Sequence, residues 1–166
     1  MLESISSLRG LLRIGTLADS TLIAQKFTEI RMVACCSPGY AAARRRPATP
    51  ADIKRHPCLL YGQEARTGWE FLIDGVTRTF EVQGPLRANN GEVIRDGAIA
   101  GLGIALLPEF IVASALANGK LIEVFDTFVS PPLTLYAVYP QHRESSMTIR
   151  ALTQFLRQRF ARAIGM

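Results

Sequence analysis

Residues 87–108 read RANNGEVIRDGAIAGLGIALLP, and this stretch indicates the fold class more strongly than any other. Asn89 and Asn90 can cap a short amphipathic helix, because an asparagine side chain accepts hydrogen bonds from first-turn amides. Gly101 can end that helix in a left-handed turn, and the apolar IALL run that follows predicts a strand stopped by Pro108. The stretch therefore predicts a strand-loop-helix-strand passage, in which the start of the helix offers unpaired N–H groups to a ligand.

The rest of the chain alternates short strands with short helices. Apolar runs predict strands at 11–14, 30–36, 59–61, 104–107, 121–125 and 133–139. Helices are expected at 92–100, at 109–117, and from Ser145 or Ser146 to about Ala163. A loop is predicted at 16–20, and turns are predicted at 37–40 and at Pro131-Pro132. Because no long all-helical or all-strand block interrupts this order, the chain is predicted to be α/β.

Two local motifs lie in the middle of the chain. Thr49-Pro50-Ala51-Asp52 predicts the start of a short helix with a capping box, and Pro57 stops that helix. Asp74-Gly75 lies between two alternating runs, at 69–73 and 78–82, which predicts a β-hairpin. The side chains expected to face inward from this hairpin are Trp69, Phe71, Ile73, Phe80 and Val82.

Length and composition are those of an ordinary globular protein. The 166 residues suffice for one domain or two small lobes, and 48% hydrophobic with 20% charged residues excludes wholesale disorder. The net charge is +5, and residues 143–166 contribute five arginines against one acid. A solvated helix face explains this local excess as well as nucleic-acid contact does, and Arg44–Arg46 is interpreted as a solvated loop rather than a binding patch.

The cysteines and histidines show no pattern of metal ligands. Cys35, Cys36 and Cys58 are interpreted as buried small hydrophobic residues in a reducing cytoplasm, and a redox-sensing thiol is the open alternative. His56 and His142 have no cysteine or carboxylate at ligand spacing, so no metal site is expected.

No catalytic or cofactor-binding motif stands out. The chain has no Gly-x-Ser-x-Gly elbow and no Cys/His signature, although the members of a Ser-His-Asp triad meet only in space. The glycines of Gly101-Leu102-Gly103 end a helix and precede a strand, which is the reverse of the order that a dinucleotide needs. No catalytic residue and no cofactor are therefore expected, and the chain is interpreted as not being an enzyme.

Signals for export, membrane insertion and DNA binding are not found in the sequence. The N-terminus lacks the pattern of a signal peptide, and no window approaches about 18 uninterrupted apolar residues. No pair of short helices with a basic second helix matches a helix-turn-helix. The sequence therefore predicts a soluble, cytoplasmic protein that does not bind DNA by itself.

The segment Asn89-Asn90-Gly91 is the strongest candidate for ligand contact. Amide side chains and free backbone N–H groups at a helix start favour a carboxylate or another small anion. Helix capping alone also explains both asparagines, so the two interpretations stay open at this point.

Several motifs, in order, resemble those of one protein family. They are IGTLADS at 14–20, SPGY at 37–40, AGLGIALLP at 100–108 and LYAVYP at 135–140. Together they resemble the C-terminal effector-binding domain of LysR-type transcriptional regulators, over about Leu12 to Phe160.

This resemblance implies a fold of Rossmann-like lobes of the type II periplasmic-binding-protein kind, with a small inducer bound between them. By this mapping, residues 36–136 form a nearly complete second lobe, and residues 1–35 and 137–166 form a partial first lobe. The family's helix-turn-helix domain, its linker helix and the opening of its first lobe have no counterpart in the sequence, which implies an N-terminally truncated domain.

The resemblance also implies which residues contact the inducer. They are Gly15, Thr16 and Leu17 of the first lobe, Tyr61 and Gly62 at a strand end of the second lobe, and Asn89, Asn90 and Gly91 at its helix start. The expected partners are a small organic, anionic inducer, further copies of the chain and intact family members. DNA is expected to bind only through the missing helix-turn-helix domain.

Two alternatives remain open from the sequence. One is a solute-binding protein of the same fold, against which the missing export signal argues. The other is a small enzyme, which requires His56 or His142 against a nucleophile in a deep pocket, and neither histidine maps to the expected cleft.

Overall fold

The computed structural model describes residues 11–14, 22–62, 68–125 and 127–140, and three single positions, Met147, Ala151 and Gln154. The chain divides into two compact units: unit 1 comprises Met1–Ile30 with Leu133–Met166, and unit 2 comprises Arg31–Pro132. The predicted loop at 16–20 and nearly all of the predicted C-terminal helix lie outside the described residues. The three single positions within that predicted helix are helical.

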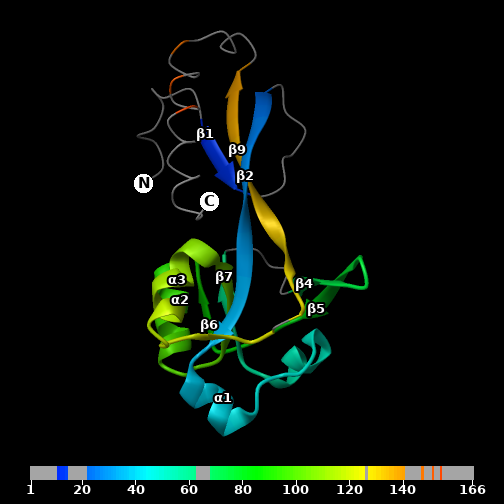
Figure 1. Cartoon of the computed structure of the whole chain (residues 1–166), viewed down its shortest axis with the longest axis vertical. Coiled ribbons are helices and arrows are strands. Elements are labelled where there is room, and N and C mark those ends of the chain that lie inside the picture. Colours follow the sequence, from blue (N-terminus) through cyan, green and yellow to red (C-terminus); the bar gives the residue numbers. More distant parts are fainter. Residues whose placement is uncertain are drawn as a thin grey trace. The chain divides into compact units, whose positions relative to one another are not determined.

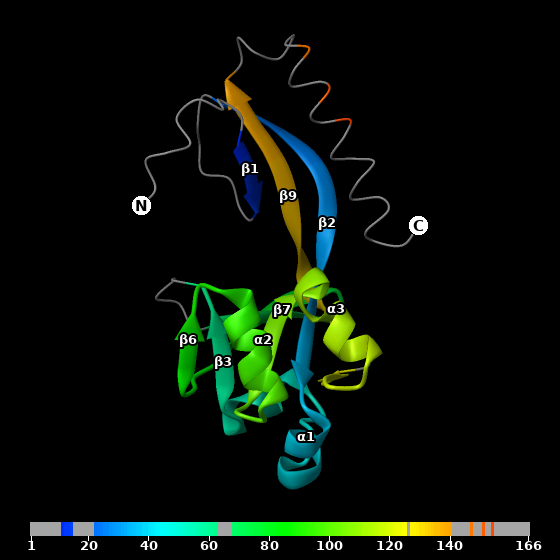
Figure 2. The same cartoon turned by 90° about the vertical axis from the view of Figure 1, so that its left-hand side faces the viewer.

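The described part of unit 1 consists mainly of strands. They are β1 (Leu11–Ile14), β2 (Leu22–Cys36) as far as Ile30, and β9 (Ser130–Pro140) from Leu133 onward. β1 pairs with β9 in antiparallel fashion, with Leu12 opposite Ala137, and β9 lies between β1 and β2 (Figure 2). The strands predicted at 11–14, 30–36 and 133–139 are confirmed.

Both long strands extend beyond the predicted ranges. β2 begins at Leu22 rather than at residue 30, because its first half carries exposed polar side chains such as Lys26 and Glu29, which a search for apolar runs does not detect. β9 begins at Ser130, so the turn predicted at Pro131-Pro132 is wrong. Proline is tolerated in the first residues of a strand, where its missing N–H matters least.

Unit 2 is built on a mixed sheet whose strands run in the order β2, β7, β3 and β6 (Figure 2). β3 (Cys58–Tyr61) is parallel to both β6 (Leu86–Ala88) and β7 (Ile104–Pro108), whereas β2 is antiparallel to β7 and to β8 (Ile122–Glu123). β8 is shorter than the strand predicted at 121–125. Because β3, β6 and β7 are parallel, their carboxyl ends lie at one edge of the sheet.

Four short helices connect the strands of unit 2 within its described residues: α1 (Pro38–Arg44), the 3₁₀ helix η1 (Pro50–Arg55), α2 (Gly91–Ile99) and α3 (Glu109–Ala117). The turn predicted at 37–40 is wrong, because Ser37 caps α1 by accepting a hydrogen bond from the Tyr40 amide at 3.2 Å. The helix start at Thr49 is confirmed, since the Thr49 amide and hydroxyl both donate to Asp52 Oδ2, at 3.0 and 2.9 Å.

The predicted ends of α2 and α3 are confirmed. Asn90 caps α2, and Gly101 follows its end with φ +79°. Gly119 follows α3 with φ +74°. Glycine adopts this left-handed conformation without the steric cost that a side chain brings, which is why both helices stop where the sequence places a glycine.

Side chains alternate between two apolar layers on the two faces of the sheet. Val33, Cys35 and Leu59 pack beneath α2 and α3, whereas Ala34, Cys36 and Leu60 face the opposite layer. That second layer contains η1 and the hairpin of β4 (Gly68–Ile73) and β5 (Val76–Glu81), which Figure 1 shows on the other side of the sheet from the two helices.

The predicted hairpin and the predicted burial of the three cysteines are confirmed. Trp69, Phe71 and Val82 are buried, and Ile73 and Phe80 are partly buried against the same cluster. Cys35, Cys36 and Cys58 are completely buried. In the described part of the chain, no helix is long and apolar enough to cross a membrane.

Candidate functional site

The carboxyl ends of β3 and β6 bring several predicted site residues together. Tyr61 pairs with Ala88, and the Gly62 amide donates to the Ala88 carbonyl at 2.9 Å. Tyr61 and Gly62 therefore lie beside Asn89, Asn90 and Gly91, which follow β6 directly. We call these five residues the β3–β6 edge. In open α/β sheets, ligands bind outside the carboxyl ends of parallel strands, so this edge is a candidate ligand site.

Tyr61 and Gly62 give this edge an aromatic ring next to a turn. Tyr61 is 42% exposed although the three residues before it in β3 are buried. Gly62 has φ +107°, and a Cβ at this position has open space around it. Glycine is therefore required here by the backbone conformation and not by a neighbouring group.

The two asparagines make different contacts. Asn90 Oδ1 accepts a hydrogen bond from the Glu92 amide at 2.9 Å, so this side chain is the N-cap of α2. The Asn89 side chain is exposed and makes no hydrogen bond with any other residue that the structure describes. Capping accounts for Asn90 and leaves Asn89 without a structural role at this edge.

Gly91 has a packing role in addition to its place at the start of α2. It is buried, and a Cβ there would collide with Cδ1 of Ile111 in the first turn of α3. The small residue thus lets the first turns of α2 and α3 lie against each other. Since β6 leads into α2 and β7 leads into α3, both helices direct their N-termini, with unpaired first-turn amides, toward this edge.

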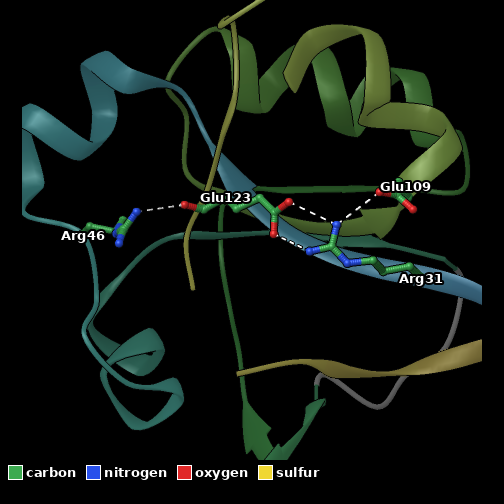
Figure 3. Close-up of polar contacts among 4 residues, drawn as sticks. All are labelled: Arg31, Arg46, Glu109 and Glu123. Carbon is green, nitrogen blue, oxygen red and sulfur yellow. Dashed lines mark hydrogen bonds and ion pairs between the residues drawn. The ribbon is translucent and has the colours of Figure 1, made fainter. Parts of the chain in front are cut away.

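An ion-pair network holds the first turn of α3 (Figure 3). Arg31 Nη1 lies 3.1 Å from Glu109 Oε1, and Arg31 Nη2 lies 2.6 Å from Glu123 Oε2. The hydrogen bond to Glu123 is the main reason that the pKa of Arg31 is raised. Glu109 is the first residue of α3, and Arg31, which it shares with Glu123, offsets part of its negative charge at the edge.

This network is not predictable from the sequence pattern. Arg31 and Glu109 are 78 positions apart, and no local pattern connects them. One part of the network could be expected from the sequence. The strand predicted at 104–107 leads directly into a helix, so if it is parallel to the strand at 59–61, the first residue of that helix lies at the same edge of the sheet as residue 61.

Gly15, Thr16 and Leu17 lie outside the described residues, as does His142. Among the residues that are described, no group of three or more His, Cys, Asp or Glu side chains is arranged to hold a metal ion. His56 lies away from the β3–β6 edge, two residues before β3, and its Nδ1 is 2.8 Å from the Tyr40 hydroxyl.

Comparison with known proteins identifies the family. The LysR substrate binding domain model matches residues 10–161. An uncharacterized HTH-type transcriptional regulator of Haemophilus influenzae is 32% identical over 143 residues, covering 86% of this chain and 50% of that protein. The uncharacterized HTH-type transcriptional regulator YhjC of Escherichia coli is 33% identical over 148 residues, with coverages of 87% and 50%.

Solved structures agree with this result. CrgA, a LysR-type transcriptional regulator from Neisseria meningitidis, matches 93% of this chain and 53% of its own, with a TM-score of 0.73 and 26% identity. The fold is therefore the periplasmic-binding-protein-like α/β fold of such regulatory domains. The chain belongs to the LysR substrate-binding domain family, and the relatives that it matches are HTH-type transcriptional regulators.

Regulators of this family bind small-molecule effectors and form oligomers, and they are not enzymes. The chain spans about half the length of the curated relatives that it matches.

Proposed function

We propose that unit 2 binds its effector, a small organic anion, at the β3–β6 edge. The observation that carries this proposal is Asn89, whose exposed side chain has no partner among the described residues and precedes the capped start of α2. The Asn89 side-chain amide and the first-turn amides of α2 other than that of Glu92, which Asn90 caps, can donate to one carboxylate. The ring of Tyr61 offers apolar contact to the rest of the ligand.

The N-termini of α2 and α3 favour an anion over a cation at this edge. A helix N-terminus stabilises a nearby negative charge by about 0.3–1 kcal/mol, and each hydrogen bond to a charged group adds about 1.5–3 kcal/mol. The negative charge of Glu109 opposes this preference, and its ion pair with Arg31 weakens that effect. Gly15, Thr16 and Leu17 stay predicted effector contacts.

We also propose that residues 36–136 are the second lobe of the domain and that 1–35 with 137–166 belong to the first lobe. The division of the chain into Arg31–Pro132 and the remaining residues supports this assignment. The two buried layers of unit 2 contain enough apolar side chains for a core of its own.

In the cell, the proposed role of this domain is to sense an inducer without catalysing a reaction. The similarity to HTH-type regulators supports a cytoplasmic location and DNA binding through a helix-turn-helix domain. Self-association, and pairing with intact family members, are the proposed protein contacts.

Thermal unfolding with small carboxylates tests the proposed site. Acetate, succinate and benzoate are added separately, and at least one is expected to raise the melting temperature of the wild type in a saturable way. Asn89→Ala should weaken that binding by about tenfold or more, because a hydrogen bond to the anion is lost.

Gln83→Ala is the matched control, because Gln83 is another exposed amide side chain and lies ahead of β6 rather than after it. It should bind as the wild type does. Equal losses in both variants, or no stabilisation by any of the three anions, contradict the proposed site.

A further inference from the structure

A basic cavity of about 400 Å³ lies at the opposite end of β3 from Tyr61. Its charged and titratable lining residues are Arg44, Arg45, Arg46, Arg55, Asp52 and His56. They come from the end of α1, from the loop that follows it and from η1. The volume is within the range of small-molecule sites, which begins at about 300 Å³.

The lining carries a strong excess of positive charge, four guanidinium groups against one carboxylate. Asp52 Oδ2 already accepts two hydrogen bonds from Thr49, and these bonds hold the pKa of Asp52 below its usual range. In the part of the chain that the structure describes, Arg44, Arg45 and Arg55 make no side-chain hydrogen bond or ion pair. Three guanidinium groups are thus available to a ligand at one concave surface.

The cavity wall is held in place by the rest of unit 2. Arg46 Nη1 donates to the backbone carbonyl of Glu123 at 3.2 Å, and the Glu123 carboxylate is bound by Arg31, as Figure 3 shows. Arg45 has φ 53° and ψ 114°, a left-handed backbone conformation that a residue with a side chain rarely adopts. Strained residues of this kind cluster at ligand sites, where the surrounding structure maintains them.

We propose that this cavity is a second ligand site of the domain, separate from the β3–β6 edge, and that it takes a small molecule carrying a phosphate group. Guanidinium groups bind phosphate oxygens in pairs of parallel hydrogen bonds, and a phosphate carries enough negative charge to balance the excess. The hollow shape fits a compact ligand better than the convex backbone of a nucleic-acid duplex.

Calorimetric titration with inorganic pyrophosphate tests this site, with the full 166-residue chain. The wild type should bind one pyrophosphate, and Arg44→Gln and Arg55→Gln should each weaken binding by about tenfold. Arg78→Gln removes the same charge from an exposed position of β5 outside the cavity lining, so it should change the affinity by less than about twofold.

The Arg45→Gly variant distinguishes the loss of a ligand contact from a loss of stability. Glycine relieves the positive φ, so the melting temperature should stay the same or rise while pyrophosphate affinity falls. Any of three results overturns the proposal: no saturable binding to the wild type, equal losses of affinity in Arg55→Gln and Arg78→Gln, or full affinity in Arg45→Gly. Stronger binding of citrate, or of duplex DNA through the same arginines, overturns the assignment to a phosphate-bearing small molecule.

Discussion

Asn89 and Asn90 are neighbours in the sequence but differ in what they contact. Asn90 binds the Glu92 amide, whereas Asn89 is exposed. Asn90→Ala should lower the free energy of unfolding by about 1 kcal/mol, because an N-cap is lost, and Asn89→Ala should change it by less than about 0.5 kcal/mol. Urea unfolding of both variants measures the difference, and equal losses would show that Asn89 also supports the fold.

His56 makes the stability of unit 2 depend on pH. Burial lowers the pKa of His56 below its usual value of 6.5. The negative charge of Asp52 opposes this shift, and the positive charge of Arg44 adds to it. The Tyr40 hydroxyl contacts the His56 ring. The unfolded chain therefore binds a proton more readily than the folded chain, and stability should fall as the pH decreases through about 6.5.

The melting temperature at about pH 7.5 and about pH 5.5 checks this expectation. His56→Gln should lose less stability on acidification than the wild type, since its side chain does not titrate. His142 is present in both proteins, so its effect cancels in the comparison. An identical acid-induced loss in both proteins would assign the effect to other groups.

The three thiols should be unreactive in the folded protein. Burial raises the pKa of Cys35 to about 12, of Cys36 to about 11 and of Cys58 to about 12. Because the thiolate is the reactive form, a disulfide reagent at mildly alkaline pH should label none of them before unfolding and all three in urea. Rapid labelling of the native chain would instead support a redox-sensing thiol.

At the scale of elements, two glycines allow the neighbouring segments to pack closely against the start of β3. A Cβ on Gly84 would collide with the Cys58 backbone, and a Cβ on Gly103 would collide with the Pro57 carbonyl. Neither backbone can move without breaking pairing, because the Cys58 amide donates to Gln83 and the Ile104 amide donates to Pro57.

Gly103→Ala should therefore destabilise the protein by about 3 kcal/mol or more, measured by urea unfolding. Gly39→Ala is the control, because Gly39 is exposed in α1 and a Cβ there meets nothing within 4 Å. In a helix this exchange is neutral or stabilising by up to about 1 kcal/mol. Similar losses in both variants would contradict the close packing at Gly103.

The elements that could be predicted are those with local signals. The cap at Asn90, the Asp74-Gly75 turn and the glycines after α2 and α3 each specify a conformation within a few residues. The first half of β2 could not be predicted in this way, because its strand conformation depends on pairing with distant segments.

The same distinction applies to the candidate sites. Tyr61 and Asn89 come together because two parallel strands end side by side, which follows from an α/β order of elements. The Arg31–Glu109 pair and the basic cavity depend on the full three-dimensional arrangement. The sequence pattern of Arg44–Arg46 indicates a solvated loop, and it does not show that Arg55 lines the same cavity.

At the scale of the whole molecule, α3 carries a large aromatic side chain that the described residues of unit 2 leave exposed. Phe110 is 64% exposed. We expect sedimentation velocity to show self-association of the wild type that Phe110→Ser weakens, because large exposed aromatic residues commonly anchor protein interfaces. Val76→Ser alters an exposed apolar residue at the start of β5 and should leave the assembly unchanged. Identical behaviour of the two variants would place the interface elsewhere.

The effector is proposed to bind where β3, β6 and α2 meet. A ¹⁵N–¹H correlation spectrum of the chain, titrated separately with acetate, succinate and benzoate, tests this proposal most directly. We expect saturable shifts of the Gly62, Asn89 and Gly91 amides with at least one anion, and we expect these shifts to be lost in Asn89→Ala. Saturable shifts confined to other residues, or no saturable shift with any of the three, would contradict it.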